Sequence, residues 1–435
     1  MKLKPYPKYK ESGVQWIGEI PEVWEVHKIK FKETVIMGQS PDSEDYNYEN
    51  RGHPFLQGNA EFTELNPNPI IWCEMCNKFS QKNDILLSVR APVGALNISD
   101  KKYGIGRGLC AIRCKLPNHK FIFYQLMTFE FYLNSISTGS TYTAISTDDV
   151  ANLVVRYPSI NEQSKISSFL DSKTSEIDKT IEKDKQLIEL LKEKRIALIN
   201  HVVTKGLNPK AKMKDSGIDW IGEIPENWEV KKLKFVSDIN ISNVDKKSEE
   251  GEIDVLLCNY VDVYKNEFIT PKINFMKATA SFEQIRRFNI KKYDVIITKD
   301  SEEPTDIAVP ALITEDLNGV VCGYHLALIR PNKLILQGSY LLRALQSKKI
   351  NDQFIIEANG VTRFGISTYP ILNSYITLPP KSEQIKIAEF LDKSTLKIDQ
   401  IVQKVEAKIE LLEEFKKSLI HHVVTGKVDV RSVTA

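Results

Sequence analysis

The sequence predicts a two-domain α/β (α+β) protein whose domains are separated by two long antiparallel coiled-coil helices. Two internal repeats carry this prediction. Residues 11–31 return at 215–235, an offset of 204, and residues 158–204 return at 379–425, an offset of 221. An arm, a variable region and a long helix therefore occur twice in the same order, which indicates a tandem duplication and a pseudo-twofold internal repeat.

Four segments follow from the repeats: an arm with a first variable domain (1–157), a helical spacer (158–207), a second arm and variable domain (208–378) and a final helical spacer (379–435). The 435 residues are 42% apolar and 27% charged, as in globular proteins with hydrophobic cores. We expect a cytoplasmic protein, because no stretch approaches the roughly 18 apolar residues of a membrane span and the first residues lack a signal-peptide core. Six cysteines suit a reducing compartment.

The two spacers predict long amphipathic helices. Their apolar side chains recur at alternating spacings of four and three, as in a heptad seam that two helices bury against each other. The apolar seam residues are Leu170, Ile177, Ile181, Ile188, Leu191 and Leu198 in the first spacer, and Leu391, Ile398, Val402, Ile409, Leu412 and Leu419 in the second. Polar residues interrupt the seam and are expected to cost stability and to set register: Asp184, Arg195 and Lys416.

Capping signals bound both helices. Ser159 and Glu162 match a capping box, and Gly206 and Gly426 can take the left-handed conformation just past the last turns. About 43 residues at 1.5 Å each give rods of roughly 65 Å, which would hold two domains at a fixed separation. The alternative is that each helix folds onto its own domain, as ordinary surface helices with an apolar stripe do.

The two variable regions share a skeleton although their sequences differ. In each, an Asp leads a buried strand into a loop, a second apolar strand follows, and helical segments lie near the end. These segments are 83–98, 108–115 and 120–137 in the first region, and 293–309, 324–332 and 339–357 in the second. At the 221 offset, Gly139, Thr141, Ile145, Ser146 and Thr147 recur as Gly360, Thr362, Ile366, Ser367 and Thr368. A shared core with differing loops is expected of one binding fold that reads two targets.

The repeated arm, WIGEIPxxWEVxKxKF, contains Trp16 and Trp24 in the first copy and Trp220 and Trp228 in the second. Tryptophan is used both as an exposed interface anchor and as a core residue. We favour core packing, with each arm closing the base of its variable domain.

Charge neither requires nor excludes a polyanionic partner. The net charge is +2, and the variable regions carry 12 basic against 13 acidic residues (32–157) and 16 against 18 (236–378). Any nucleic-acid surface must therefore be a local patch, and each single loop cation is by itself more readily a solvated surface charge. The candidate DNA contacts are Arg90, Lys101, Lys102, Arg107 and Thr141 in the first region, and Arg286, Arg287, Lys291, Lys292, Lys299, Thr362 and Arg363 in the second.

The motifs together resemble those of a known family. A PxxWEVxKxKF arm, a region ending in Gly-x-Thr, Ile-Ser-Thr and LPP, the EQxKIAxFLD block and a terminal HHVVTGKV are similar to the specificity subunit of Type I restriction-modification systems. The likeness covers both halves, with a mild departure where the first copy reads NEQSKISSFLD.

That resemblance implies two target recognition domains, each reading one half of a split DNA sequence. It also implies assembly with two methylation subunits and with restriction subunits, so that adenine methylation and restriction are carried out by partners. S-adenosylmethionine, ATP and Mg are then expected in those partner subunits, with no cofactor in this one. Base-contacting residues do not transfer from the family, because its variable domains diverge too far.

An enzymatic function finds little support in the sequence. An Asn/Asp-Pro-Pro-Tyr/Phe motif, a phosphate-binding loop and a G-x-S-x-G elbow are all missing. Cys73, Cys76, Cys110 and Cys114 suggest zinc, but a spacing of four on a strand separates the last two by about 13 Å. We therefore expect a non-catalytic chain with no metal site. The alternative function is a coiled-coil scaffold whose two variable domains bind protein.

Overall fold

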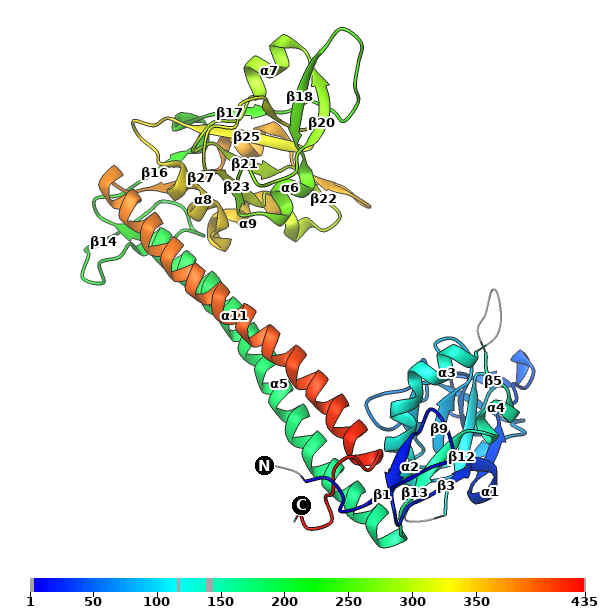
Figure 1. Ribbon diagram of the computed structural model, residues 1–435. Helices are drawn as coiled ribbons and strands as arrows, with labels where there is room; N and C mark the ends of the chain where they lie inside the picture. Colours follow the sequence, from blue (N-terminus) through cyan, green and yellow to red (C-terminus); the bar gives the residue numbers. More distant parts are fainter. Residues whose placement is uncertain (1–3, 116–117, 138–143, 434–435) are drawn as a thin grey trace. The chain divides into compact units, whose positions relative to one another are not determined.

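The structure, a computed structural model, describes residues 4–115, 118–137 and 144–433. Over these residues the chain divides into two compact units, unit 1 (Met1–Asp184 with Glu406–Ala435) and unit 2 (Lys185–Val405). Each unit contains an arm, a mixed α/β domain and half of each long helix (Figure 1). In the described part of the chain, no helix has both the length and the apolar character that crossing a membrane requires.

The long helices are α5 (Ile160–Lys205) and α11 (Lys381–Val424), and they lie side by side (Figure 1). In unit 1, Asp178 is ion-paired with Lys416 at 2.6 Å, and Asp184 with Lys408 at 2.8 Å. Residue numbers on α11 fall as those on α5 rise, so the helices are antiparallel. The fold class predicted from the sequence is confirmed.

The seam positions form the contact between the helices. Leu170, Ile177, Ile181, Ile188, Leu391, Ile398 and Leu419 are buried, and Leu191, Leu198, Val402, Ile409 and Leu412 are half-buried. Each polar seam residue has a charged partner on the other helix. Asp184 and Lys416 form the two ion pairs of unit 1 given above, and in unit 2 Arg195 contacts Asp399 at 3.1 Å. These ion pairs explain how a seam with polar interruptions remains paired.

The helix ends differ in one respect from the predicted caps. Ser159 Oγ accepts the Glu162 backbone N–H at 3.3 Å, but the Glu162 carboxylate does not return to Ser159. It accepts hydrogen bonds from Tyr6 Oη at 2.7 Å and Trp24 Nε1 at 3.1 Å. The predicted capping box is therefore wrong in the reciprocal bond from Glu162 to the Ser159 backbone, because the Glu162 carboxylate binds the arm instead. Gly206 and Gly426 both have φ of +76°, as predicted for left-handed helix ends.

The β-strands of unit 1 build two principal sheets. The main sheet is antiparallel, with the order β10 (Leu96–Ile98), β9 (Ile85–Ser88), β12 (Leu109–Arg113) and β4 (Thr34–Met37). The second has the order β5 (Tyr46–Asn47), β7 (Ile71–Cys73), β6 (His53–Leu56), β11 (Tyr103–Ile105) and β8 (Phe79–Ser80). In the arm, β1 (Tyr9–Glu11) pairs with β2 (Glu19–Pro21), and β3 (Glu25–Lys28) pairs with β13 (Val154–Tyr157).

Unit 2 repeats this plan with additions. Its main sheet has the order β17 (Ser237–Ile241), β25 (Leu326–Pro331), β21 (Val295–Thr298), β23 (Pro310–Ile313) and β19 (Phe268–Ile269). Beside it lies a sheet of β20 (Met276–Ala280), β18 (Ile253–Cys258) and β24 (Val320–Cys322). Smaller pairs are β14 (Met213–Asp215) with β15 (Glu223–Pro225), β16 (Glu229–Lys232) with β27 (Tyr375–Leu378), and β22 (Asp300–Ser301) with β26 (Phe364–Gly365).

Short helices cover the sheets. Unit 1 has α1 (Ile29–Lys32), α2 (His119–Leu126), α3 (Glu130–Ile136) and α4 (Thr147–Ala151), with 3₁₀ turns at Ser43–Asp45 and Met127–Phe129. Unit 2 has α6 (Tyr260–Lys265), α7 (Phe282–Phe288), α8 (Gly338–Gln346), α9 (Lys348–Ile356) and α10 (Thr368–Asn373), with 3₁₀ turns at Leu233–Phe235 and Pro304–Asp306. The helical segments predicted over 120–137 and 339–357 are each broken into two.

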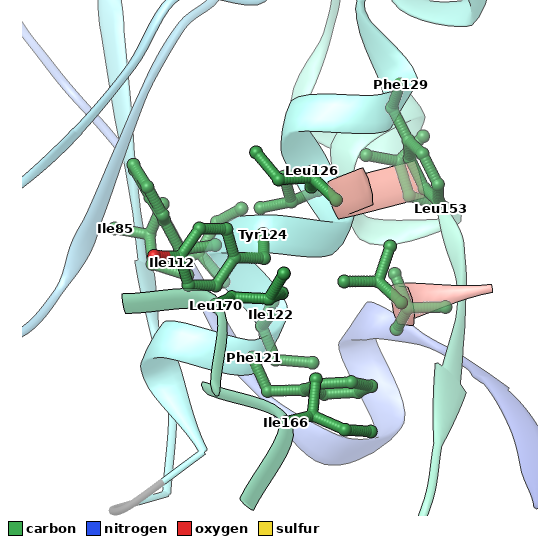
Figure 2. Close-up of a cluster of buried hydrophobic side chains, with 14 of the residues drawn as sticks. Ile85, Ile112, Phe121, Ile122, Tyr124, Leu126, Phe129, Leu153, Ile166 and Leu170 are labelled. Atoms are coloured by element: carbon green, nitrogen blue, oxygen red, sulfur yellow. The ribbon is translucent and has the colours of Figure 1, made fainter. Parts of the chain in front are cut away.

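The core of unit 1 joins its domain to the long helices. Figure 2 shows Ile85 and Ile112 of the main sheet with Phe121 and Ile122 of α2, all fully buried, beside Leu170 of α5. In unit 2 the corresponding cluster combines strand, α8 and α11 residues. Each domain is therefore fixed to its own half of the helix pair by burial of apolar surface.

The arm tryptophans divide into two classes. Trp24 and Trp228 are fully buried and donate from Nε1 to Glu162 and Glu383, at 3.1 and 3.0 Å. Trp16 and Trp220 remain 43% and 47% exposed, and Trp16 stacks on Tyr132. The expectation of core packing is met by one tryptophan of each arm, because only that one reaches the base of a long helix.

Candidate nucleic-acid interface

In both units the same strands end together and leave their loops at one edge of the main sheet. In unit 1, Gly38 N–H donates to Leu109 O at 2.9 Å, and Val89 N–H donates to Gly108 O at 2.9 Å. We call this edge the loop end of unit 1: the residues that follow β4 and β9 and those that precede β12. Three different loops converge there.

The loop end of unit 2 is built by equivalent bonds. Ser242 N–H donates to Leu326 O at 3.1 Å, and Lys299 N–H donates to His325 O at 2.8 Å. This loop end comprises the residues that follow β17 and β21 and those that precede β25. The two loop ends therefore share these two backbone hydrogen bonds at equivalent positions, although their side chains differ.

The repeated Ile-Ser-Thr segment joins each loop end. Ile145 N–H donates to Val89 O at 3.0 Å, and Ile366 N–H donates to Lys299 O at 2.9 Å. Arg90 forms a β-bridge with Ala144 in unit 1, as Asp300 does with Gly365 in unit 2. The predicted Gly139 and Thr141 lie outside the described residues.

A buried ion pair fixes the opposite edge of each main sheet. Asp84, with a side chain only 4% exposed, holds Arg113 at 2.8 Å, and Asp294, at 3%, holds Arg330 at 2.7 Å. The preceding residues, Asn83 and Tyr293, have φ of +72° and +73° and turn the chain into the strand. The Asp that leads each predicted strand therefore sets the register that places the loop end.

The structure separates the cations predicted for the first domain. Arg90 and Arg107 are exposed at the loop end, where the hydrogen bond from Val89 N–H to Gly108 O ties together the segments that carry them. Lys101 and Lys102 are exposed at the opposite edge, because Ser99 N–H donates to Asp84 O at 2.9 Å. The four cations therefore do not form one patch, because the hairpin of β9 and β10 reverses the chain between Arg90 and Lys101.

The cations predicted for the second domain are also separated. Lys299, Thr362 and Arg363 lie at the loop end, since β22 pairs with β26 there. Lys291 and Lys292 precede β21 at the opposite edge. The remaining pair, Arg286 and Arg287, lies on α7, where Arg287 Nε donates to Asn240 Oδ1 at 2.8 Å. The strand β21 separates Lys291 and Lys292 from Lys299, so these residues do not form one patch.

Several loop-end residues are not among the candidates predicted from the sequence. In unit 2, His325 Nδ1 lies 2.5 Å from Asp300, and Tyr324 is 47% exposed with Lys299 over its ring. Tyr264 donates to Asp306 at 2.6 Å, and this hydrogen bond raises the pKa of Tyr264, so that its hydroxyl stays protonated. Aligning Asp84 with Asp294 places Asp300 opposite Arg90, and aligning Arg113 with Arg330 places Tyr324 opposite Arg107, so an alignment at both strands would have identified these positions.

In unit 1 the neighbouring loops carry neutral polar groups. Tyr46 Oη donates to Gln57 Oε1 at 3.2 Å, and Ser40 Oγ accepts the Arg107 backbone N–H at 3.1 Å. Burial raises the pKa of Tyr46, which therefore remains a hydroxyl donor. Together with Arg90, the edge presents cations and hydrogen-bonding groups of the kinds that contact phosphates and base edges.

The cysteines considered for zinc are free thiols. Burial raises the pKa of Cys76 and of Cys110 to about 12, which opposes the thiolate form that binds metal. Among the described residues, the structure contains no group of three or more His, Cys, Asp or Glu side chains placed to hold a metal ion.

Comparisons with known proteins point to one family. The family model of the Type I restriction modification DNA specificity domain matches residues 21–192 and 225–411. A putative type I restriction enzyme MjaX specificity subunit from Methanocaldococcus jannaschii is 40% identical over 191 residues, 42% of this chain and 44% of that relative's length. The MjaVIII specificity subunit of the same organism is 25% identical, with 98% of each chain covered.

Solved structures share the fold. The HsdS subunit from Thermoanaerobacter tengcongensis has a TM-score of 0.55 at 16% identity, covering 94% of this chain and 98% of that one. A chain from a structure concerned with complex assembly and conformational transition of the type I R-M system has a TM-score of 0.72 at 15% identity, covering 94% and 99%. Since the family model matches most of the sequence in two copies, the chain belongs to the type I restriction-modification DNA specificity family.

Proposed function

We propose that this chain is the sequence-specific DNA-recognition subunit of a type I restriction-modification complex, and that each of its domains reads one half of a bipartite site. The observation that carries the proposal is the loop end: one hydrogen-bonded framework in both units that presents different side chains. Arg90 and Arg107 occupy it in unit 1, and Lys299, Tyr324 and Arg363 in unit 2. A common frame with different contacts suits two different half-sites.

DNA binding by the chain alone should be weak. The loop ends offer few cations, and both variable regions are slightly acidic overall. Affinity for a duplex grows with the number of phosphates that basic side chains neutralise. A partner that also contacts the duplex would supply the remaining affinity.

Catalysis is assigned to partner subunits in this proposal. Two methylation subunits would bring S-adenosylmethionine and methylate adenine, and restriction subunits would use ATP and Mg. A duplicated exposed position supports two identical partners: Leu190 on α5 and Leu411 on α11, related by the 221 offset, are 62% and 65% exposed. One lies in each unit, so two copies of one subunit could dock in equivalent ways.

The test uses the purified full chain, alone and mixed with the methylation subunits of its system. We expect weak duplex binding and no S-adenosylmethionine-dependent methylation from the chain alone, and sequence-specific binding with methyl transfer from the mixture. Methyl transfer by the chain alone would overturn the non-catalytic assignment. Leu190→Ser with Leu411→Ser should weaken the mixed complex, whereas Leu334→Ser, at an 83% exposed leucine outside the long helices, serves as the matched control.

A further inference from the structure

The two loop ends carry different chemistry at equivalent positions. The β-bridges of Arg90 to Ala144 and of Asp300 to Gly365 make Arg90 the counterpart of Asp300. The backbone N–H of Arg107 donates to Ser40 Oγ at 3.1 Å, and the backbone N–H of Tyr324 donates to Val244 O at 2.7 Å. Ser40 and Val244 are related by the 204 offset of the arms, so Arg107 is the counterpart of Tyr324.

In unit 1 the two positions present a pair of guanidinium groups. Val89 N–H donates to Gly108 O at 2.9 Å, and this bond continues the register that pairs Ser88 with Leu109. Arg90 directly follows Val89, Arg107 directly precedes Gly108 within the turn closed by the Leu109 N–H to Gly106 O hydrogen bond at 3.0 Å, and both side chains are exposed. Within the described residues neither guanidinium has a carboxylate partner, unlike Arg113 of the same sheet. Two exposed guanidinium groups without carboxylate partners, carried by backbone segments that one hydrogen bond ties together, favour an anionic or acceptor-rich ligand.

In unit 2 the same two positions present a carboxylate and an aromatic ring. Asp300 is paired with His325 at 2.5 Å, and its side chain keeps 18% of its surface exposed. Tyr324 is 47% exposed and lies against His325, with ring centroids 4.0 Å apart. The loop end of unit 2 therefore has an acceptor where unit 1 has a donor.

We propose that Arg90 and Arg107 read a guanine in the half-site of unit 1, and that Asp300 reads a base with an exposed amino group in the half-site of unit 2. In the major groove, a guanidinium donates to guanine O6 and N7, whereas a carboxylate accepts from the amino group of cytosine or adenine. The inference rests on the proposed function and assigns to each domain the residue that discriminates one base pair.

The experiment selects bound duplexes from a random-sequence library, using the full chain together with its methylation subunits. Arg90→Ala and Arg107→Ala should each reduce the preference for guanine at one position of one half-site by about tenfold, the discrimination expected of a bidentate contact. The other half-site should not change. Lys101→Ala removes the same charge at the opposite edge of the same domain, and its selected motif should equal that of the unmodified chain.

The second arm tests unit 2. Asp300→Ala should abolish the preference for adenine or cytosine at one position of the other half-site, and the base that is lost shows which amino group is read. Asp254→Ala, at an exposed position on β18, is the matched control. His325→Asn breaks the ion pair but keeps the Asp300 carboxylate, so that variant should keep the preference if Asp300 contacts the base directly.

The outcomes separate this inference from the function on which it rests. A split motif that stays unchanged in Arg90→Ala, Arg107→Ala and Asp300→Ala overturns the inference and leaves the proposed function intact. An equal loss of affinity for all sequences would assign these residues to phosphate contacts and also overturn it. Failure of the unmodified complex to select any motif would overturn the proposed function and the inference together.

Discussion

Units 1 and 2 agree in the bonds that hold the framework and differ in the side chains at its outer edge. Both bury a tryptophan against the first turn of a long helix, and both tie two strands together through a buried Asp–Arg pair. At the loop end, the counterparts Arg90 and Asp300 have opposite charge. The comparison shows that residues setting strand register can stay the same while the presented chemistry changes, because framework and contacts use different side chains.

The largest effect that can break this comparison comes from the buried tryptophans. Trp24→Ala and Trp228→Ala each remove a fully buried indole and should destabilise their own unit by about 3–5 kcal/mol. Hydrogen exchange, read segment by segment, should show the loss of protection in that unit. An equal loss of protection in both units would contradict two separately packed copies.

Conservative changes sharpen the same comparison. Trp24→Phe leaves the Glu162 carboxylate with the Tyr6 hydroxyl at 2.7 Å, whereas Trp228→Phe removes the only side-chain donor that the described structure gives Glu383. The Trp228 variant should therefore lose more stability, by about 1 kcal/mol.

The buried Asp–Arg pairs give the next effect. Asp84→Ala and Asp294→Ala each leave an arginine without its carboxylate partner. Each should lower the free energy of unfolding by about 2 kcal/mol, less than for a fully buried pair, because the arginine side chain is a quarter to a third exposed and solvent screens its charge. Chemical denaturation followed by a probe in each unit measures the cost. Asp254→Ala, at an exposed strand position, should change stability by less than about 0.5 kcal/mol. Similar values for all three variants would contradict the assigned role in setting register.

The helix pair offers a subtler test. Asp178–Lys416 and Asp399–Arg195 are related by the 221 offset, but Asp184–Lys408 corresponds to Val405 and Leu187. Asp184→Val combined with Lys408→Leu gives unit 1 the same apolar residues that unit 2 has at these two positions. It should leave stability within about 1 kcal/mol of the original or raise it, since an ion pair whose lysine is 53% exposed adds little over apolar packing. A loss well above that in thermal denaturation would show that the two halves of the helix pair are not interchangeable.

The smallest expected effect depends on pH. Burial raises the pKa of Glu33, whose counterpart in unit 2 is Ser237. The folded-state pKa lies above the unfolded value of about 4.3, so folded unit 1 binds the proton more readily, and its stability falls as pH rises from that value through the raised one. Glu33→Gln should flatten this decline in unit 1 and leave unit 2 unchanged. Denaturation at several pH values measures this dependence. If the stability of unit 1 falls with pH by the same amount in the variant as in the original chain, the assignment is refuted.

The sequence predicted those features that depend on local periodicity. Heptad spacing is enough to predict α5 and α11, because the pattern from Leu170 to Leu198 and from Leu391 to Leu419 repeats along one face of a helix. The Asp-led strands at Asp84 and Asp294 were also evident from sequence, because buried apolar runs follow them directly.

Features that depend on strand register could not be predicted from the sequence. Lys101 lies 11 positions from Arg90, yet the β9–β10 hairpin places the two residues at opposite edges of the sheet. The pairing of Asp84 with Arg113, and of Asp300 with His325, joins residues brought together only by sheet order. The base-reading residues stay a proposal for the same reason: they depend on which side chains meet at one edge.

The measurement that tests the central claim most directly is an exchange of residues 32–157 for the corresponding segment of a relative with a different target. The exchanged segment carries Asp84, Arg113 and the loop end of unit 1, while Trp24 and Glu162 stay in the recipient chain. Sequencing of methylated sites in cells that also express the methylation subunits reads the target. We predict that one half of the split motif changes to that of the donor while the other half stays the same. A change in both halves, or in neither, would contradict the account of two independent reading domains on one repeated framework.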